Sequence, residues 1–157
     1  MALSVDDIKA RYPLPVYNYK VEINGEVIAF SEVSGLSKSF ETSTYKESKT
    51  TEPGGGPVFM YMPGQAQAIN ITLKKGYVRT KNLPVFYDWI NGTRINQIEK
   101  KDITVRLTDE EGNAVVTWRV INAFPTKLDA PTFDANSNDV AIESLELMAD
   151  DLLMEEN

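Results

Sequence analysis

The segment Lys101–Phe124, KDITVRLTDEEGNAVVTWRVINAF, decides the fold. Its first part alternates polar and apolar side chains and places Ile103, Val105 and Leu107 on one side, which is the period-two pattern of a half-buried strand. The polar loop DEEGN interrupts the pattern, and Ala114–Phe124 resumes as a strand rich in Val, Ile, Trp and Phe. The segment therefore predicts a long antiparallel hairpin, against which other strands can be laid.

The composition predicts a single globular domain that spans residues 1–157. The chain has a formal net charge of −7, with 42% hydrophobic and 25% charged residues. This acidic balance disfavours tight binding to nucleic acid or to an anionic membrane surface. Because the chain has no Cys and no His, thiolate nucleophiles, disulfides, Ser-His triads and the usual zinc sites are excluded. We expect no cofactor and no specific nucleic-acid binding.

The pattern of the N-terminal region predicts no targeting signal. Met1–Leu14 lacks the basic start and the apolar run of a signal peptide. No stretch approaches the roughly 18 consecutive apolar residues of a membrane-spanning helix. We therefore expect synthesis in the cytoplasm and no direct membrane span.

Further segments carry strand patterns. Val16–Ile23 and Glu26–Val33 flank Asn24-Gly25, the dipeptide favoured in two-residue hairpins because both central positions need positive φ. Val140–Ala149 is the last predicted strand. Its apolar positions change phase around Glu143-Ser144, which predicts a β-bulge.

Helix signals occur at two places. Ala2–Ala10 predicts one or two marginal turns of helix, capped by Ser4 and ended by the prolines that follow. Thr80–Asn91 is the one convincing helix, with Gly92 as its C-terminal stop. Its predicted apolar face consists of Leu83, Phe86, Tyr87 and Ile90. One helix of this length covers only one sheet face.

Two predicted strands have one face of small polar side chains. In Leu36–Lys46 this face consists of Ser37, Ser39, Glu41 and Ser43. In Gln65–Lys75 it consists of Ala68, Asn70, Thr72 and Lys74, opposite an apolar face. We expect such faces to meet water rather than a core.

The segments 47–63 and 150–157 are predicted to be irregular. Glu47–Pro63 contains three prolines and Gly54-Gly55-Gly56 and has no periodicity, so it is interpreted as a long loop. A loop of this length is unusual inside a compact domain and is often functional. Asp150–Asn157 is acidic and predicts a loosely ordered tail.

Catalytic interpretations find little support in the sequence. The three glycines lack the Lys-Ser/Thr and the following helix of a phosphate-binding loop. Paired carboxylates could serve a glycosidase, but residues 109–111 lie in a hairpin turn and residues 150–156 in the tail, where nothing would raise a pKa. Trp89 and Trp118 are interpreted as core residues rather than as ligand platforms. We assign no catalytic and no metal-binding residue, and we expect no enzyme.

The predicted fold class is mainly β: an antiparallel β-sandwich or partial barrel with one α-helix. Six or more strands with one helix as cover leave sheet edges that must be paired or blocked. Neighbouring copies that supply the missing pairing would close a ring whose polar faces point inward to water. The alternative is a monomeric β-sandwich that serves as a binding or adaptor module.

Four stretches carry a resemblance to a known family. They are Tyr17–Leu36 (YNYKVEINGEVIAFSEVSGL), Met62–Ile90 (MPGQAQAINITLKKGYVRTKNLPVFYDWI), Asp102–Lys127 (DITVRLTDEEGNAVVTWRVINAFPTK) and Asp139–Leu147 (DVAIESLEL). In these stretches the chain resembles the tail tube proteins of contractile phages and the inner tube proteins of contractile injection systems. Those proteins are similar in fold to the haemolysin-coregulated protein of type VI secretion. The chain departs from the family at its end, where it reads Met148-Ala149-Asp150-Asp151 in place of a His-Glu-Gly-like segment.

The resemblance implies hexameric β-barrel rings that stack into a rigid hollow tube inside a contractile sheath. Sheath contraction would drive the tube through a target envelope, and cargo, either protein toxin or DNA, would pass along the lumen. The implied partners are further copies of the chain, the sheath protein, the baseplate or spike, and the tube terminator. The particle would be made in a bacterial or phage-infected cytoplasm and then released or anchored. A phage tail, an extracellular injection system and a membrane-anchored one all stay open.

Two surfaces are predicted on this basis. The first would line the lumen and consists of Ser37, Ser39, Glu41, Ser43, Ala68, Asn70, Thr72 and Lys74. The alternative places these residues on the outer wall, against the sheath. The second would dock on the adjacent ring and consists of Pro53, Gly54, Gly55, Gly56, Pro57, Val58 and Phe59. A long Pro/Gly segment that carries apolar side chains is suited to such docking.

Overall fold

The computed structural model describes residues 2–49, 54–77 and 85–156. Within these ranges the chain is mainly β, as predicted, but it has two helices rather than one. The elements in chain order are α1 (Val5–Arg11), β1 (Tyr19–Ile23), β2 (Glu26–Ile28), β3 (Glu32–Ser34), β4 (Phe40–Glu47), β5 (Val58–Ala66), β6 (Ile69–Gly76), α2 (Val85–Asn91), β7 (Lys101–Thr108), β8 (Ala114–Asp129), β9 (Ile142–Ala149) and β10 (Asp151–Glu156).

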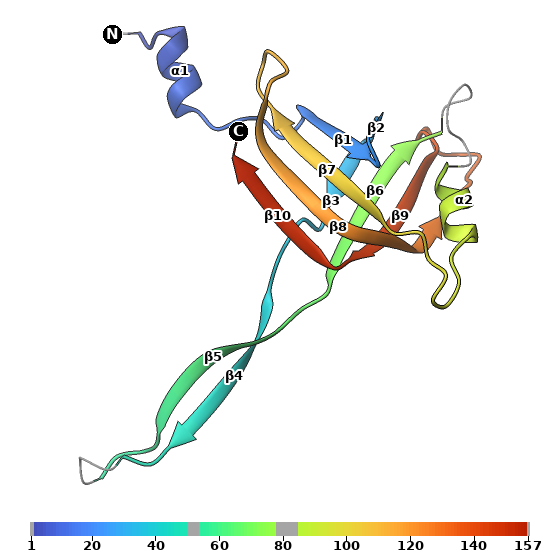
Figure 1. The fold of residues 1–157 in the computed structure, drawn as a ribbon. Coiled ribbons are helices and arrows are strands. Elements are labelled where there is room, and N and C mark those ends of the chain that lie inside the picture. Colours follow the sequence, from blue (N-terminus) through green and yellow to red (C-terminus); the bar gives the residue numbers. More distant parts are fainter. Residues whose placement is uncertain (1, 50–53, 78–84, 157) are drawn as a thin grey trace.

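The hairpin predicted from the sequence is β7–β8, and it organises the fold (Figure 1). Strand β8 continues past the predicted end at Phe124 and runs to Asp129. Its first part, Val116–Ile121, pairs with β10, and its last part, Phe124–Asp129, pairs with β9. Because one long strand has different partners along its length, β8 belongs to both layers of the fold.

The strands follow the order β2-β1-β7-β8-β9-β6-β3, and β10 pairs with β8 beside this path. We call β2, β1, β7, β8 and β10 the first layer, and β8, β9, β6 and β3 the second layer. The layers share a hydrophobic core that includes Val21, Ile23, Ile103, Val105 and Val120 from the first layer and Ile69, Ile71, Leu73, Leu145 and Leu147 from the second. The sheet stays open, because β2 and β3 lie at opposite ends of the path.

Helix α2 contributes to the core with a face that differs from the predicted one. Phe86 is fully buried, as predicted, and Trp89 is buried too, but Tyr87 is exposed. The Nε1 atom of Trp89 donates a hydrogen bond to the carbonyl oxygen of Glu99 at 2.8 Å, which fixes the indole against the segment after the helix. The predicted helical residue Leu83 lies outside the described residues.

Helix α1 forms where its cap predicts it. The hydroxyl of Ser4 accepts a hydrogen bond from the backbone N–H of Asp7, and the Asp7 carboxylate accepts in return from Ser4, which completes a capping box. No residue of α1 is buried. The helix therefore stands outside the two layers (Figure 1).

The two N-terminal strands are shorter than predicted. Asn24 and Gly25 have φ values of 56° and 86°, which confirms the predicted turn. However, β1 begins only at Tyr19, and the strand expected over Glu26–Val33 is split into β2 and β3. Phe30 lies between the two strands and stacks on Phe86, with ring centroids 5.7 Å apart. The chain thereby crosses to the second layer, where β3 pairs with β6.

The β-bulge predicted at Glu143-Ser144 is wrong. Strand β9 pairs with β6 in continuous register from Ile142 to Ala149. Buried and exposed residues alternate along the whole strand, because Glu143 itself occupies a core-facing position and is only 2% exposed. Its Oε1 atom lies 3.5 Å from the Nζ atom of the buried Lys75.

The long loop and the loose tail are corrected as well. Of the loop expected over Glu47–Pro63, the last part belongs to strand β5, which pairs with β4. The segment expected to be a loosely ordered tail forms strand β10, in which Leu152 is buried. Both segments are thus regular because a partner strand satisfies their backbone hydrogen bonds.

Candidate assembly surfaces

Strands β4 and β5 form a two-stranded ribbon that we call the arm. The arm extends away from the two layers (Figure 1). Every residue of β4 is exposed, and so are all residues of β5 except the half-buried Val58 and Gly64. An isolated two-stranded hairpin is only marginally stable in water. The arm therefore needs a second surface to be held rigid.

The arm carries apolar side chains on both of its faces. Residues opposite each other in an antiparallel pair point to the same face, and the pairing joins Tyr45 with Met60 and Thr44 with Tyr61. One face, which we call the methionine face, carries Tyr45, Val58, Met60 and Met62. The other face carries Phe59 and Tyr61, and the Nζ atom of Lys46 lies 5.2 Å from the centroid of the Phe59 ring. Contiguous apolar exposure of this kind marks an interaction surface.

The root of the arm is fixed by close backbone contacts. Gly35 has a φ of 88°, and a Cβ atom at this position would lie 2.1 Å from the carbonyl oxygen of Asn70. The backbone N–H of Gln67 donates to the carbonyl oxygen of Ser39 at 2.9 Å. The Oγ atom of Ser39 donates to Oε1 of Gln67, also at 2.9 Å. The two strands of the arm thus leave the second layer in a defined direction.

An ion pair ties the arm root to strand β10. The Nζ atom of Lys38 lies 2.9 Å from Oδ1 of Asp151. This contact lowers the pKa of the Asp151 carboxyl, and a hydrogen bond from the backbone N–H of Leu152 lowers it further. Because the pKa is lower in the folded protein, the ionised carboxylate stabilises the folded state at any pH above the ordinary pKa of an aspartate. This stabilisation is lost as the pH falls through the lowered pKa of Asp151. Since both side chains are close to half exposed, the pair adds little stability.

The structure brings together only part of the predicted lumen surface. Asn70, Thr72 and Lys74 share the outer face of β6, opposite the buried Ile71. Ser37 and Ser39 lie instead at the arm root, Glu41 and Ser43 lie within β4, and Ala68 lies between β5 and β6. In one copy the eight residues therefore do not form one surface.

Neighbouring strands extend the polar face of β6 with residues that the sequence analysis did not assign. The pairing places Ser34 of β3 and Glu146 of β9 on either side of Thr72. Glu32 and Ser144 flank Lys74 in the same way, and Oε2 of Glu32 lies 3.0 Å from Nζ of Lys74. The sequence could have indicated this part of the face, because Ser144 and Glu146 alternate with buried leucines along β9. The prediction of a bulge in this strand concealed that alternation.

The predicted docking segment lies at the tip of the arm. Gly54, Gly55, Gly56 and Pro57 are exposed, and they lead directly into Val58 and Phe59 at the start of β5. Pro53 lies outside the described residues.

Several of the carboxylates considered for acid–base chemistry are engaged in surface ion pairs. Glu110 and Glu111 lie 3.6 and 3.7 Å from Nζ of Lys9. Asp150 lies 3.6 Å from Nζ of Lys100. Among the residues that the structure describes, no group of three or more side chains could hold a metal ion. Neither helix in those ranges has the length and apolar content needed to cross a bilayer.

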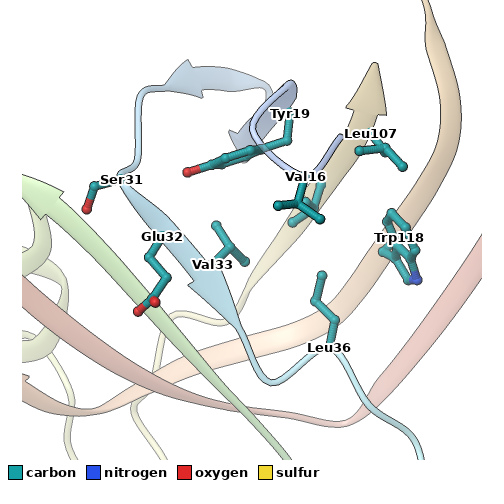
Figure 2. A pocket seen from close by; sticks show the side chains of 9 residues that line it. Val16, Tyr19, Ser31, Glu32, Val33, Leu36, Leu107 and Trp118 are labelled. Atoms are coloured by element: carbon teal, nitrogen blue, oxygen red, sulfur yellow. The ribbon is translucent and has the colours of Figure 1, made fainter. Parts of the chain in front are cut away.

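An apolar pocket opens between the two layers, where β3 and the segment that follows it approach β7 and β8 (Figure 2). Its volume is about 350 Å³. It is lined by Val16, Tyr19, Ser31, Glu32, Val33, Leu36, Val105, Leu107 and Trp118. The hydroxyl of Tyr19 donates a hydrogen bond to the carbonyl oxygen of Phe30 at 2.6 Å, which holds that ring at the pocket wall.

Comparisons with known proteins identify relatives along the whole chain. The family model of the T4-like virus tail tube protein gp19 matches residues 15–153. A chain in the sheath–tube complex of an extracellular contractile injection system (PVC), in the extended state, is 44% identical. It covers 99% of this chain and 100% of its own length, with a TM-score of 0.87. A chain of the anti-feeding prophage cap (AFP tube terminating cap) is also 44% identical and covers 100% of both chains, with a TM-score of 0.84.

More distant structures share the fold. Hcp1 from Flavobacterium johnsoniae is 18% identical, covers 90% of this chain and 97% of its own length, and gives a TM-score of 0.52. A search of curated protein sequences gave no match.

Proposed function

Since the chain belongs to the tail tube protein family of T4-like viruses, it is a structural subunit of a tube and not an enzyme, and we propose that six copies form each ring of that tube. The observation that carries the role in a tube is the match to the sheath–tube complex at 44% identity over 99% of the chain. The number of six copies is proposed from the resemblance of the sequence to tail tube proteins. The chain is accordingly a component of a contractile injection system particle.

The open sheet supports a closed ring of copies. Within the described residues, β2 and β3 each pair along one edge only. Unpaired strand edges in a stable protein are blocked or matched with another chain. Edge-to-edge pairing between identical copies forms a ring when the rotation between neighbours closes. Closure would leave the outer face of the second layer on one wall of the ring.

We further propose that the polar outer face of the second layer lines the lumen. Asn70 and Thr72 are joined there by Ser34, Ser144 and Glu146, which are short or acidic side chains. Such a wall offers few apolar contacts, so that it would bind protein cargo weakly, and its acidic groups would repel DNA. Ser37, Ser39, Glu41 and Ser43 would join this wall only if the arm of each copy also lies along the lumen.

The remaining partners follow from the assemblies in which the relatives occur. The PVC relative lies in a sheath–tube complex and the AFP relative in a tube terminating cap. We propose that this chain likewise assembles inside a sheath protein, ends at a terminator and starts on a baseplate or spike. Synthesis in a bacterial cytoplasm and conduction of cargo through the lumen complete the proposal.

Imaging of the purified chain tests the ring. Negative-stain micrographs are expected to show six-fold rings or stacked hollow tubes, and mass photometry of the same sample should give masses near six chains and multiples of six. Rings of another symmetry would refute the hexamer. A reconstruction that places Asn70 and Ser144 on the outer wall would refute the lumen assignment and leave the ring intact.

Shortening the arm tests the ring-to-ring contact. Deletion of Gly54–Gly56 is expected to leave rings but to prevent their stacking, because the tip would no longer reach its neighbour. Tube length in micrographs measures the effect. Replacement of the three glycines by asparagine, which tolerates positive φ, keeps the length of the arm and is the matched control. Tubes of normal length from the deletion variant would contradict the contact.

A further inference from the structure

The chain carries asparagine directly before glycine at two places, Asn24-Gly25 and Asn91-Gly92. In such a pair the backbone nitrogen of the glycine can attack the side-chain amide carbon of the asparagine, because glycine has no side chain that obstructs the approach. The attack requires the backbone of the pair to leave its average conformation, which happens in local opening events. The structure around each pair therefore decides whether the pair reacts.

Asn24-Gly25 forms the turn between β1 and β2, and both residues are exposed. The strand pairing joins Ile23 with Glu26, so the N–H of Gly25 lies outside the ladder of hydrogen bonds. A Cβ atom added to Gly25 would meet nothing within 4 Å, so the space around the turn is open. Within the described part of the chain, β2 has three residues and pairs along one edge only. Such a turn opens locally at little cost.

Asn91-Gly92 lies at the end of α2 and is held more firmly. The backbone N–H of Gly92 donates a hydrogen bond to the carbonyl oxygen of Asp88 at 3.1 Å. The Nη1 atom of Arg94 donates to the carbonyl oxygen of Asn91 at 2.8 Å. The nitrogen that would attack is thus engaged in the last turn of the helix, and the backbone on its other side is fixed by the arginine.

We propose that Asn24 is a site of spontaneous deamidation and that the fold protects Asn91 from the same reaction. Solvent base removes the proton from the N–H of Gly25, and the nitrogen forms a bond to Cγ of Asn24. The bond from Cγ to Nδ2 breaks, and the amide group takes up a proton and leaves as ammonia. Water then opens the cyclic imide at either of its two carbonyl groups. Attack at Cγ gives aspartate, and attack at the main-chain carbonyl carbon gives isoaspartate.

The two products have different effects on the turn. Aspartate tolerates the φ of 56° that Asn24 adopts, so its effect is one added negative charge. Isoaspartate adds a methylene group to the backbone, and a two-residue turn has a fixed geometry that does not accommodate it. Isoaspartate is therefore expected to detach the edge strand β2 from β1. If sheet edges pair between copies, as the proposed function requires, such a chain is excluded from the ring.

Ageing of the purified chain at mildly alkaline pH tests the site. Trypsin places the two pairs in separate peptides, residues 21–38 and 82–94, so mass spectrometry follows both in one digest. We expect Asn24 to lose its amide at least about tenfold faster than Asn91 in the folded chain, since Asn91 reacts only when α2 opens. In concentrated urea the two rates should converge, because the fold no longer distinguishes the pairs. Equal rates in the folded chain, or faster loss at Asn91, would overturn the proposal.

Sedimentation of the aged chain tests the effect of isoaspartate. Peptide 21–38 with isoaspartate is expected to be enriched in the supernatant and depleted in pelleted tubes. Asn24→Gly is the matched control, because it removes the reactive amide and keeps a dipeptide that suits the turn, and it should pellet equally before and after ageing. Equal amounts of isoaspartate in pellet and supernatant would overturn the exclusion from the ring. Failure of the fresh chain to form any ring or tube would contradict the proposed function and leave the deamidation result unaffected.

Discussion

Replacing Gly35 with alanine is expected to lower the free energy of unfolding by about 3–5 kcal/mol, which removes much of the stability of an ordinary domain. Two costs add at this position. The φ of 88° is strained for any residue with a Cβ atom. In addition, the new Cβ would lie 2.1 Å from the carbonyl oxygen and 3.1 Å from the carbonyl carbon of Asn70. These are backbone atoms of β6, paired with β9 through Met148, so they cannot move aside cheaply.

The turn residue Gly25 offers a matched control. Its φ of 86° is nearly the same, but an added Cβ atom would meet nothing within 4 Å. Gly25→Ala should therefore show the backbone strain alone, about 1–2 kcal/mol. Urea unfolding followed by circular dichroism compares the two variants. Equal losses of stability would mean that the approach of Gly35 to β6 is relieved at little cost, which would contradict the fixed direction of the arm root.

The sequence predicted best those elements whose pattern arises from burial on one side. Ile103, Val105 and Leu107 alternate with polar residues because β7 has one face on the core, and the hairpin followed directly from this pattern. The Asn24-Gly25 turn was predictable because its backbone geometry restricts the residue types. In both cases the cause is local, so a single sequence displays it.

The arm was missed because neither of its faces packs on the core of its own copy. One-sided burial produces the period-two signal, and Val58–Met62 is apolar on both faces of the ribbon. A segment of this kind is indistinguishable from an apolar loop until its pairing with β4 is known. The polar face of β6 was predictable from its own alternation, but its continuation onto β3 and β9 depends on long-range pairing.

The predicted bulge failed for a related reason. The change of phase was inferred because Val140 and Ile142 were placed on the apolar face together with Leu145 and Leu147, which makes Glu143 a surface residue. Its partner Lys75 lies far away in the sequence, and the pair is inside the fold with relative exposures of 2% and 8%. The Nζ atom of Lys75 also lies 4.8 Å from the centroid of the Phe86 ring. The buried ion pair thus contacts α2 through the Phe86 ring and helps to pack this helix on the second layer.

Removing one member of this buried pair is expected to cost about 3–5 kcal/mol of stability. Glu143→Leu leaves the Lys75 ammonium in the interior without this carboxylate, and Lys75→Met leaves the Glu143 carboxylate there without this cation. Tyr77 would report the first change, because burial and the hydrogen bond to Glu143 raise the pKa of its phenol and loss of the carboxylate should lower that pKa. The double variant, Lys75→Met with Glu143→Leu, should recover most of the loss, since apolar residues of similar volume can replace a buried ion pair at little cost.

Urea unfolding of the unmodified chain, the two single variants and the double variant gives the coupling energy of the pair. A double variant as unstable as the sum of the single variants would show that the two charges act independently and that something other than their pairing keeps Glu143 on the core face of β9.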